Sequence, residues 1–351
     1  MAGQYSTGRA VVDWPPLALT MGDPAGIGLE ISLMAWRERT RWSLPPFALV
    51  GDAGAVRERA RLIGADVPVV GIADLAETAG RFGAALPVLD VPLAERAEAG
   101  KPDSRSGKAV IHSIETATAL VCRGEAAAIV TNPIAKSVLY AAGFAHPGHT
   151  EFLAALAGQH CPGRSYHPVM MLASDELRVV PLTVHVPVAS VPAAITGTLI
   201  VETLDIMASA LTHDFDIAAP RIAVAGLNPH AGEAGTIGCE DRDVIAPAIV
   251  QARAKGLAVS GPHSADTLFH AEARRHYDGV LCMYHDQALI PIKTLSFDTG
   301  VNVTLGLPFV RTSPDHGTAF DIAGKGIASP LSLIEALRMA DRHAANRAAR
   351  R

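Results

Sequence analysis

The sequence predicts an α/β protein built on a largely parallel sheet. Short apolar runs of strand length alternate along the chain with longer segments of helical spacing, and this alternation is typical of such sheets. A chain of 351 residues is too long for one compact core, so we expect two domains. No repeat or low-complexity linker interrupts the alternation. The chain is therefore expected to cross between its domains inside packed structure.

The expected elements follow from the apolar periodicity. Strands are expected at 17–20, 47–50, 85–89, 127–130, 169–172, 179–184, 222–225 and 280–283. Helices are expected at 29–39, 54–63, 107–123, 149–158, 191–212, 240–255, 266–275 and 331–347.

The first expected strand runs into the glycine-rich segment MGDPAGIG at 21–28. Its glycines follow the order G-x-x-x-G-x-G, which differs from the dinucleotide-binding order G-x-G-x-x-G, and Pro24 lies inside the turn. We therefore interpret the segment as a tight strand-to-helix turn that lines a cleft.

Composition excludes several classes of protein. A hydrophobic content of 49% and a mean hydropathy of +0.24 exclude a disordered chain. A net charge of −5, without a Lys/Arg run along an element, argues against a nucleic-acid partner. The longest apolar stretch, 191–211, carries Glu202 and Asp205 and predicts an amphipathic helix instead of a membrane span. Residues 1–16 lack the apolar core of a signal peptide, so we expect a cytoplasmic location without membrane partners.

The four cysteines are far apart in the sequence: Cys122, Cys161, Cys239 and Cys282. No CxxC pair occurs, so the pattern indicates neither a zinc ribbon nor a disulfide framework. This pattern is consistent with the reducing cytoplasm.

Three histidines follow strand-like runs: His185, His230 and His285. One histidine at a strand end more often caps a neighbouring backbone group than binds a ligand. Three of them at the carboxyl ends of strands predict a catalytic metal site with an open position, zinc being the expected ion. Asp286 and Asp266 are the carboxylates expected near this metal, where either could orient a ligand histidine or move a proton. For Asp266 an N-cap of the following helix is the alternative.

A second group of residues predicts an anion site. His149 and Thr150 stand at an expected helix start, where backbone amides are free to bind an anion. Lys293, Asn302 and Arg311 are polar residues within largely apolar runs. Together these five residues predict a site for phosphate or carboxylate.

Six motifs carry a resemblance to a known family: MGDPAGIG (21–28), PGHTE (147–151), NPHAGE (228–233), MYHDQ (283–287), GVNVTLGLPFVRTS (300–313) and HGTAFDIAGKGIASP (316–330). The last resembles the adenosine-binding loop of the isocitrate and isopropylmalate dehydrogenase superfamily. Together the motifs resemble the 4-hydroxythreonine-4-phosphate dehydrogenase family of the vitamin B6 pathway, over residues 17–339.

The resemblance implies an isocitrate/isopropylmalate dehydrogenase-like fold, with two α/β domains flanking a cleft. Residues 1–138 and 296–351 would form a discontinuous nucleotide-binding domain, and 139–295 a metal-binding and dimerisation domain. The family binds its metal through the residues that match His185, His230 and His285, and its phosphorylated substrate through those that match His149, Thr150, Lys293, Asn302 and Arg311. Asp266, Asp286 and Lys293 are the catalytic candidates. The active site is shared across a homodimer in this family.

The implied reaction is the NAD-dependent oxidation of 4-phosphohydroxy-L-threonine to a β-keto acid, which loses CO₂ to form 3-amino-2-oxopropyl phosphate. Within the same class, the alternative is an oxidative decarboxylase of D-threonate or D-erythronate 4-phosphate. An alternative from a different functional class is a metal-dependent phosphoester hydrolase or binding protein. Zinc suits the histidines best, with cobalt, manganese and magnesium as alternatives.

The cofactor loop is expected to comprise His316, Gly317, Thr318, Ala319 and Asp321. By the resemblance, Asp321 faces the adenosine ribose. A carboxylate there accepts hydrogen bonds from the ribose diol and repels a 2′-phosphate, so NAD is expected over NADP. Lys325, four residues on, could offset that repulsion, and capping of the turn is the alternative role for Asp321.

Overall fold

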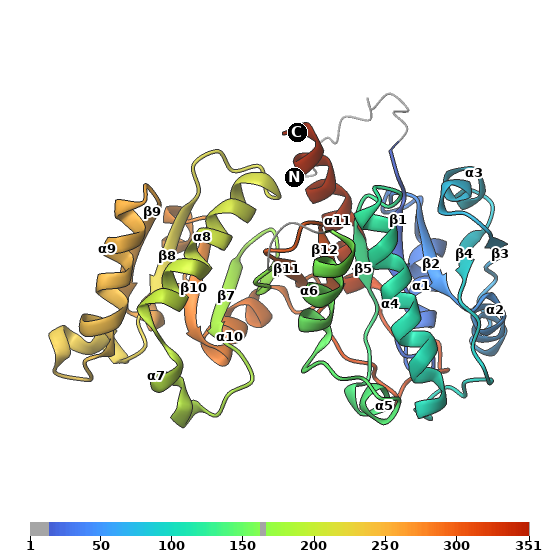
Figure 1. Ribbon diagram of the computed structural model, residues 1–351, viewed down its shortest axis with the longest axis horizontal. Coiled ribbons are helices and arrows are strands. Elements are labelled where there is room, and N and C mark those ends of the chain that lie inside the picture. Colours follow the sequence, from blue (N-terminus) through green and yellow to red (C-terminus); the bar gives the residue numbers. More distant parts are fainter. Residues whose placement is uncertain (1–13, 162–165, 351) are drawn as a thin grey trace.

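The computed structural model describes residues 14–161 and 166–350 and forms an elongated two-lobed molecule around one continuous sheet (Figure 1). The twelve strands of this sheet lie in the order β3-β4-β2-β1-β5-β12-β11-β6-β7-β10-β8-β9. The strands are β1 Leu17–Thr20, β2 Phe47–Gly51, β3 Val69–Ile72, β4 Leu86–Asp90, β5 Ile129–Thr131, β6 Val169–Ala173, β7 Arg178–Thr183, β8 Arg221–Ala225, β9 Ala258–His263, β10 Gly279–Tyr284, β11 Val301–Leu305 and β12 Arg311–Pro314.

The sheet is parallel in each lobe and antiparallel only at its centre. β11 pairs antiparallel with β12 and with β6, and β6 pairs antiparallel with β7, whereas the other pairs are parallel. Parallel strands covered on both faces are apolar throughout, and every residue of β1 and β2 is buried. The predicted α/β class with a largely parallel sheet is confirmed.

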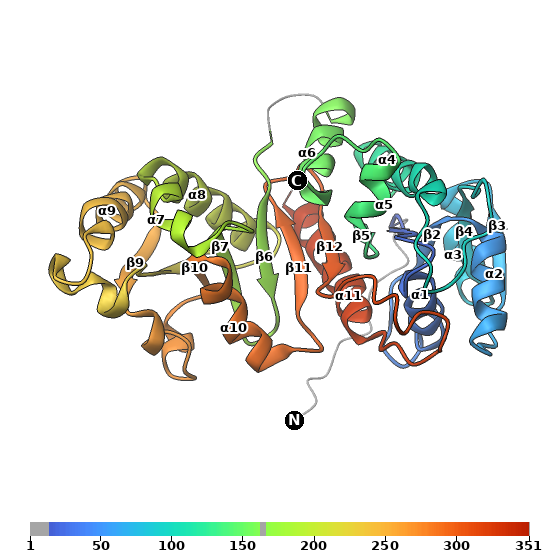
Figure 2. The ribbon, with the colours of Figure 1, turned by 90° about the horizontal axis from the view of Figure 1, so that it is seen from below.

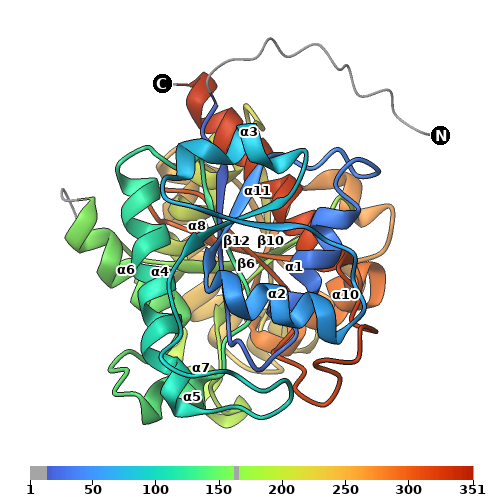
Figure 3. The same cartoon turned by 90° about the vertical axis from the view of Figure 1, so that its right-hand side faces the viewer.

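Helices cover both faces of the sheet (Figure 2). They are α1 Gly28–Arg37, α2 Ala53–Leu62, α3 Thr78–Phe82, α4 Gly107–Cys122, α5 Lys136–Ala141, α6 His149–His160, α7 Val191–Ala194, α8 Gly197–His213, α9 Ala246–Ala254, α10 His285–Ser296 and α11 Leu331–Ala349. Figure 3, the view onto the end of the N-terminal lobe, shows α4 and α1 on opposite sides of the strands.

All eight expected strands are present, but four further strands, β3, β9, β11 and β12, were missed. β11 and β12 carry polar residues such as Asn302 and Arg311 inside the ladder, so their sequences lack the continuous apolar run of a buried strand. Two helix predictions need correction. The expected helix at 191–212 is broken into α7 and α8, and the expected helix at 266–275 is only the short 3₁₀ turns Ala265–Thr267 and Ala273–His276.

The predicted division into two domains remains a proposal. The sheet runs without a break from one lobe to the other, and its centre is formed by β11 and β12, which follow the proposed boundary at 295/296. α6 follows the proposed boundary at 138/139 and packs against α4.

Among the described residues, no single helix is long and apolar enough to cross a membrane. The bent pair Val188–Ala194 and Gly197–His213 meets the criterion by length and composition alone.

The glycine-rich turn at 21–28 packs against the loop that follows β12. Ile27 N donates to Thr318 O at 3.0 Å. A Cβ on Gly26 would lie 2.8 Å from the same carbonyl oxygen, so this position requires glycine. The prediction of a tight strand-to-helix turn is confirmed, and the turn fixes the start of the predicted cofactor loop.

A buried ion pair between Glu30 and Arg59 holds the other end of this loop. Arg59 Nη1 lies 2.9 Å from Glu30 Oε1, and both side chains are almost completely buried. Glu30 also accepts hydrogen bonds from the backbone N–H groups of Gly324 and Gly326. Arg59 donates to the carbonyls of the glycine-rich turn, at 2.7 Å to Gly26 O and at 2.9 Å to Pro24 O. Burial lowers the pKa of Arg59, and the charge of Glu30 opposes that shift.

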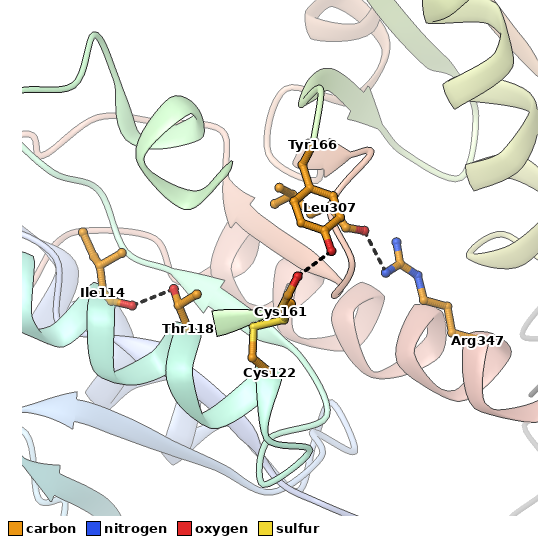
Figure 4. The surroundings of a disulfide bond; sticks show 7 residues. All are labelled: Ile114, Thr118, Cys122, Cys161, Tyr166, Leu307 and Arg347. Atoms are coloured by element: carbon orange, nitrogen blue, oxygen red, sulfur yellow. Dashed lines mark hydrogen bonds between the residues drawn. A yellow bond between two sulfur atoms is a disulfide. The ribbon is translucent and has the colours of Figure 1, made fainter. Parts of the chain in front are cut away.

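Cys122 and Cys161 form a disulfide, which corrects the expectation drawn from the cysteine spacing (Figure 4). The bond joins the last residue of α4 to the residue after α6, across 39 positions of sequence, with the two Cα atoms 5.6 Å apart. Only the packing of α4 against α6 brings the two thiols together, so the spacing could not reveal the pair. Because disulfides are rare in the reducing cytoplasm, the cysteines no longer support a cytoplasmic location. The other two cysteines are free, Cys239 exposed and Cys282 buried.

We predict that Arg59→Met will destabilise the fold strongly. The substitution leaves the carboxylate of Glu30 buried without its cation, which costs on the order of 3–5 kcal/mol of unfolding free energy. Urea denaturation measures the change.

Arg61→Met is the matched control, because Arg61 is exposed on the same helix. Its effect should stay within about 0.5 kcal/mol. Equal stability of the two variants would contradict the anchoring role of the Glu30–Arg59 pair.

Candidate functional site

A cavity of about 880 Å³ brings together all five residues predicted to form the anion site, part of the metal site and part of the cofactor loop. Its walls come from the centre of the sheet, the start of α6, the segment after β7 and the start of α10. The predicted residues that line it are His149, Thr150, His185, His285, Lys293, Asn302, Arg311, His316 and Gly317.

Arg311 provides a buried positive charge in this cavity. The side chain is 5% exposed and has no carboxylate within ion-pair distance among the residues that the structure describes. It donates instead to two hydroxyls, at 2.6 Å from Nη2 to Thr131 Oγ1 and at 2.8 Å from Nη1 to Thr304 Oγ1. Burial lowers the pKa of Arg311 to about 10, so the group still carries its charge at neutral pH. A buried cation without an acid is costly, and an anion entering the cavity would offset that cost.

His149 stands beside this charge at the start of α6. Its Nε2 atom is buried and has no hydrogen-bond partner. Desolvation, followed by the charge of Arg311, holds the pKa of His149 well below its usual range, so the imidazole is neutral. The N-terminal amides of α6 add to the attraction for an anion, because the N-terminus of a helix carries partial positive charge.

Unpartnered polar atoms gather in the cavity. Of the seven buried side-chain atoms without a hydrogen bond in the described part of the chain, Asn132 Oδ1, His149 Nε2 and His316 Nε2 belong to residues that line it. Native proteins satisfy nearly all their buried polar groups. Such a concentration at one place indicates a site whose partners arrive with a ligand.

His185 and His285 form a pair at the other side of the cavity, with ring centroids 5.6 Å apart. They follow β7 and β10, which are parallel neighbours, so both imidazoles lie at the same edge of the sheet. His185 has a φ of 49°, a left-handed conformation that is costly for a residue with a side chain and that concentrates at functional sites. Burial and the charge of Lys136 lower the pKa of His185, which favours the neutral form that binds metals.

Asp286 lies next to this pair and supports one member of it. His285 Nδ1 is 2.7 Å from Asp286 Oδ1, so a proton on Nδ1 is shared with the carboxylate and Nε2 is left to bind a ligand. Asp286 itself is exposed and does not line the main cavity. This contact fits its predicted role in orienting a ligand histidine.

The third predicted metal ligand, His230, lies elsewhere. It is exposed in the turn Pro229–Gly235 after β8, with a φ of 53°. No group of three or more His, Cys, Asp or Glu side chains in the described part of the chain is arranged to hold a metal. One chain therefore supplies two of the three expected imidazoles at one place, and the third is missing from it.

Asp266 accompanies His230 outside the cavity. Its carboxylate accepts a hydrogen bond from Ser264 Oγ at 2.6 Å, which lowers the pKa of Asp266 more than its other contacts do, with His230 making a smaller contribution. The helix that Asp266 was alternatively expected to cap does not form, so that alternative is wrong.

Lys293 lines the cavity from α10 and is paired with Asp315 at 2.8 Å. Its side chain is 38% exposed, and ion pairs of this kind contribute little to stability, so the ammonium can exchange Asp315 for an incoming anion.

The predicted cofactor loop enters the cavity only at its beginning. His316 and Gly317 line the cavity, whereas Thr318 and Ala319 turn away towards the glycine-rich turn. Asp321 is exposed, and no hydrogen bond or ion pair involves its side chain in the described part of the chain. The alternative that Asp321 caps the turn is therefore wrong, and its carboxylate is free to meet a ligand.

Sequence reasoning missed several polar residues that line the cavity, among them Thr131, Asn132, Lys136 and Glu151. Thr131 and Asn132 follow the expected strand at 127–130, so the rule that placed the histidines at strand ends would also have found them. Lys136 and Glu151 had no such signal, because each stands in a helix whose inward face is decided by packing.

Comparison with known proteins gives consistent matches over most of the chain. Residues 44–340 match the family model described as pyridoxal phosphate biosynthetic protein PdxA. The 4-hydroxythreonine-4-phosphate dehydrogenase of Methylorubrum populi is 56% identical over 332 residues, which cover 93% of this chain and 94% of the relative. The enzyme of the same name from Xanthobacter autotrophicus is 54% identical over 333 residues, covering 93% of each chain. The crystal structure of 4-hydroxythreonine-4-phosphate dehydrogenase from Klebsiella pneumoniae superimposes with a TM-score of 0.84 at 38% identity, covering 94% of this chain and 99% of the other.

We predict that Arg311→Met will weaken the binding of phosphate monoesters by about 2–4 kcal/mol, because a buried charge-assisted contact is lost. Titration calorimetry with a small phosphate monoester measures the change.

Arg338→Met is the control, since Arg338 pairs with Glu335 on α11 outside the cavity. If a correctly folded Arg311→Met variant bound the ester as tightly as the control does, the anion site would have to lie elsewhere.

Proposed function

From the premise that the chain belongs to the pyridoxal phosphate biosynthetic protein PdxA family, we propose that it oxidises 4-phosphohydroxy-L-threonine with NAD. Its curated relatives at 50–56% identity carry the name 4-hydroxythreonine-4-phosphate dehydrogenase, so the chain is an oxidoreductase of pyridoxal phosphate biosynthesis. One observation in the structure carries the proposal. A buried cation without an acid and a pair of histidines at a strand edge line the same cavity.

The phosphate of the substrate would bind at Arg311. His149, Thr150 and Asn302 line the same part of the cavity, and the start of α6 directs its backbone amides there. Lys293 would leave Asp315 to complete the positive surroundings. This arrangement holds the substrate by the end that does not react and so positions the hydroxyl-bearing carbon.

A divalent cation would bind between His185 and His285, with Asp286 holding the second nitrogen of His285. Imidazole ligands favour zinc, with cobalt, manganese and magnesium as alternatives. When bound, such an ion polarises the hydroxyl to be oxidised and stabilises the enolate formed later.

The reaction has two steps. In the first, the carbon that bears the 3-hydroxyl gives a hydride to the nicotinamide and the hydroxyl gives its proton to a base. In the second, the bond between the carboxylate and C2 breaks, CO₂ leaves, and the electron pair forms an enolate that is protonated at C2. The product is 3-amino-2-oxopropyl phosphate. Of the predicted acid–base candidates, Lys293 is the one whose side chain lines the cavity within a single chain, and we assign to its ammonium group the protonation of the enolate at C2.

The cofactor would lie against the loop from His316 to Ala319, with its adenosine ribose towards Asp321. Two contacts support this placement, because they hold the loop at both ends: Ile27 N donates to Thr318 O, and Gly324 N donates to Glu30. The exposed carboxylate of Asp321 would accept hydrogen bonds from the ribose diol and repel a 2′-phosphate, which favours NAD over NADP.

A second copy of the chain would complete the metal site. Exposed apolar side chains surround the histidine pair: Val186 and Val188 follow His185, with Val188 74% exposed, and Ile290 follows His285 at 65% exposure. Such a patch beside a polar site marks an interaction surface. Because His230 of the same chain lies outside the cavity, we propose a homodimer in which His230 of the second copy is the third ligand.

The proposed reaction is tested by absorbance at 340 nm with 4-phosphohydroxy-L-threonine, D-threonate 4-phosphate and D-erythronate 4-phosphate, each with NAD and with NADP. We expect kcat/KM to be highest for 4-phosphohydroxy-L-threonine with NAD. A higher value for either sugar-acid phosphate would reassign the substrate, and a preference for NADP would overturn the role of Asp321. Release of inorganic phosphate without reduced cofactor would indicate a hydrolase instead.

The shared metal site is tested by mixing inactive variants. His230→Ala and His285→Ala should each lose tightly bound metal and activity. Co-expressed, they should recover about a quarter of the wild-type activity, because half of randomly paired dimers are mixed and each mixed dimer has one intact site of two.

The matched control is co-expression of His185→Ala with His285→Ala. Both substitutions damage the part of the site that one chain supplies, so no mixed dimer has an intact site. Recovery in the control, or full activity of His230→Ala alone, would contradict the shared site.

A further inference from the structure

The proposed substrate carries two anionic groups, and the residues named so far account for one of them. Arg311 and Lys293, which line the same cavity, are both assigned to the phosphate in the proposed function. The carboxylate that leaves as CO₂ therefore has no cation assigned to it. A third cationic side chain, Lys136, lines the same cavity.

Lys136 is free of protein partners in the part of the chain that the structure describes. No hydrogen bond and no ion pair within 4 Å involves its ammonium group. The carboxylate of Glu151 lies on the same wall of the cavity, but it does not form an ion pair with Lys136. Lys136 is an exposed residue on the wall of the cavity, so its unpaired ammonium group is available to bind an anion.

The ammonium group of Lys136 lies close to Gly148. Lys136 is the first residue of α5, and Gly148 directly precedes α6. A Cβ on Gly148 would lie 3.6 Å from Lys136 Nζ and 2.6 Å from Glu151 Oε2. The ammonium group therefore extends over bare backbone next to the helix start that carries His149, and a larger residue at 148 would crowd this part of the cavity.

Lys136 lines the same cavity as His185 and Arg311. Burial and then the charge of Lys136 lower the pKa of His185, which agrees with the place of both side chains on the wall of one cavity.

We propose that Lys136 binds the carboxylate of the substrate; this assignment rests on the proposed function. The ion pair would orient the carboxylate and the adjoining C2 atom while hydride leaves C3. When the C1–C2 bond breaks, the negative charge moves from the carboxylate to the enolate oxygen, and neutral CO₂ leaves. Lys136 therefore stabilises the bound substrate and the oxidation step and does not assist the later decarboxylation.

The test compares ligands that differ only in the carboxylate. For Lys136→Met, kcat/KM with 4-phosphohydroxy-L-threonine should fall roughly 10- to 150-fold, mainly through a higher KM, because one charge-assisted contact is lost. The inhibition constant of 3-amino-2-oxopropyl phosphate, which lacks the carboxylate, should change less than about twofold. Lys136→Arg should retain most of the affinity for the carboxylate ligand, because the charge is kept.

Lys108→Met is the matched control, since Lys108 is exposed on α4 outside the cavity, and it should leave both constants unchanged. Equal weakening of both ligands in Lys136→Met would show a structural role and overturn the proposal, as would unchanged kinetics.

A second measurement distinguishes the role of Lys136 from the proposed function. Calorimetry measures the binding of D-erythronate 4-phosphate and of D-erythritol 4-phosphate to the same variants. A selective loss for the acid supports the role of Lys136 even if 4-phosphohydroxy-L-threonine is not oxidised. The absence of turnover with that substrate in the wild type contradicts only the proposed function.

Discussion

The burial of Arg311 at the centre of the sheet is the constraint on which the site depends. Its guanidinium joins three neighbouring strands, since Arg311 opens β12 and donates to Thr131 of β5 and to Thr304 of β11. Two hydroxyls satisfy its hydrogen-bonding geometry but leave its charge uncompensated. The fold thus pays a desolvation cost at this point that an anionic ligand can offset.

A second buried arginine shows the contrast. Arg59 is as deeply buried as Arg311, but it has its own carboxylate in Glu30 and donates in addition to two backbone carbonyls. Its charge and its hydrogen-bond donors are satisfied within the protein. With Glu30, Arg59 holds the glycine-rich turn and the loop at 324–326 together. Arg59 is a structural buried charge because a carboxylate, that of Glu30, pairs with it. Arg311 has no such carboxylate and is therefore available to a ligand.

The cavity combines rigid and adjustable parts. Arg311 and Thr131 lie on central strands, and the loop with His316 is held by Thr318 O and by Glu30. The start of α6 is held from the far end of that helix by the disulfide to α4. By contrast, the half-exposed pair of Lys293 and Asp315 and the unpaired Lys136 can shift to meet a ligand. A site of this kind fixes the phosphate by rigid groups and leaves flexible cations to adapt to the rest of the substrate.

Local pattern in the sequence was enough to determine the α/β class, the eight apolar strands and the residues at strand or helix ends, because each of these depends on neighbours a few positions away. His149 and His285 could be named for that reason, whereas Lys293, Asn302 and Arg311 were named as polar residues within largely apolar runs and from the family motifs. Tertiary packing alone decided that β11 and β12 complete the sheet despite their polar residues, that Cys122 meets Cys161 across 39 positions, and that Lys136 enters the cavity. It also separated His230 from His185 and His285, although all three follow strands. These features depend on contacts between segments far apart in the chain. Local periodicity in the sequence does not indicate which strands become neighbours or which side of a loop faces inward.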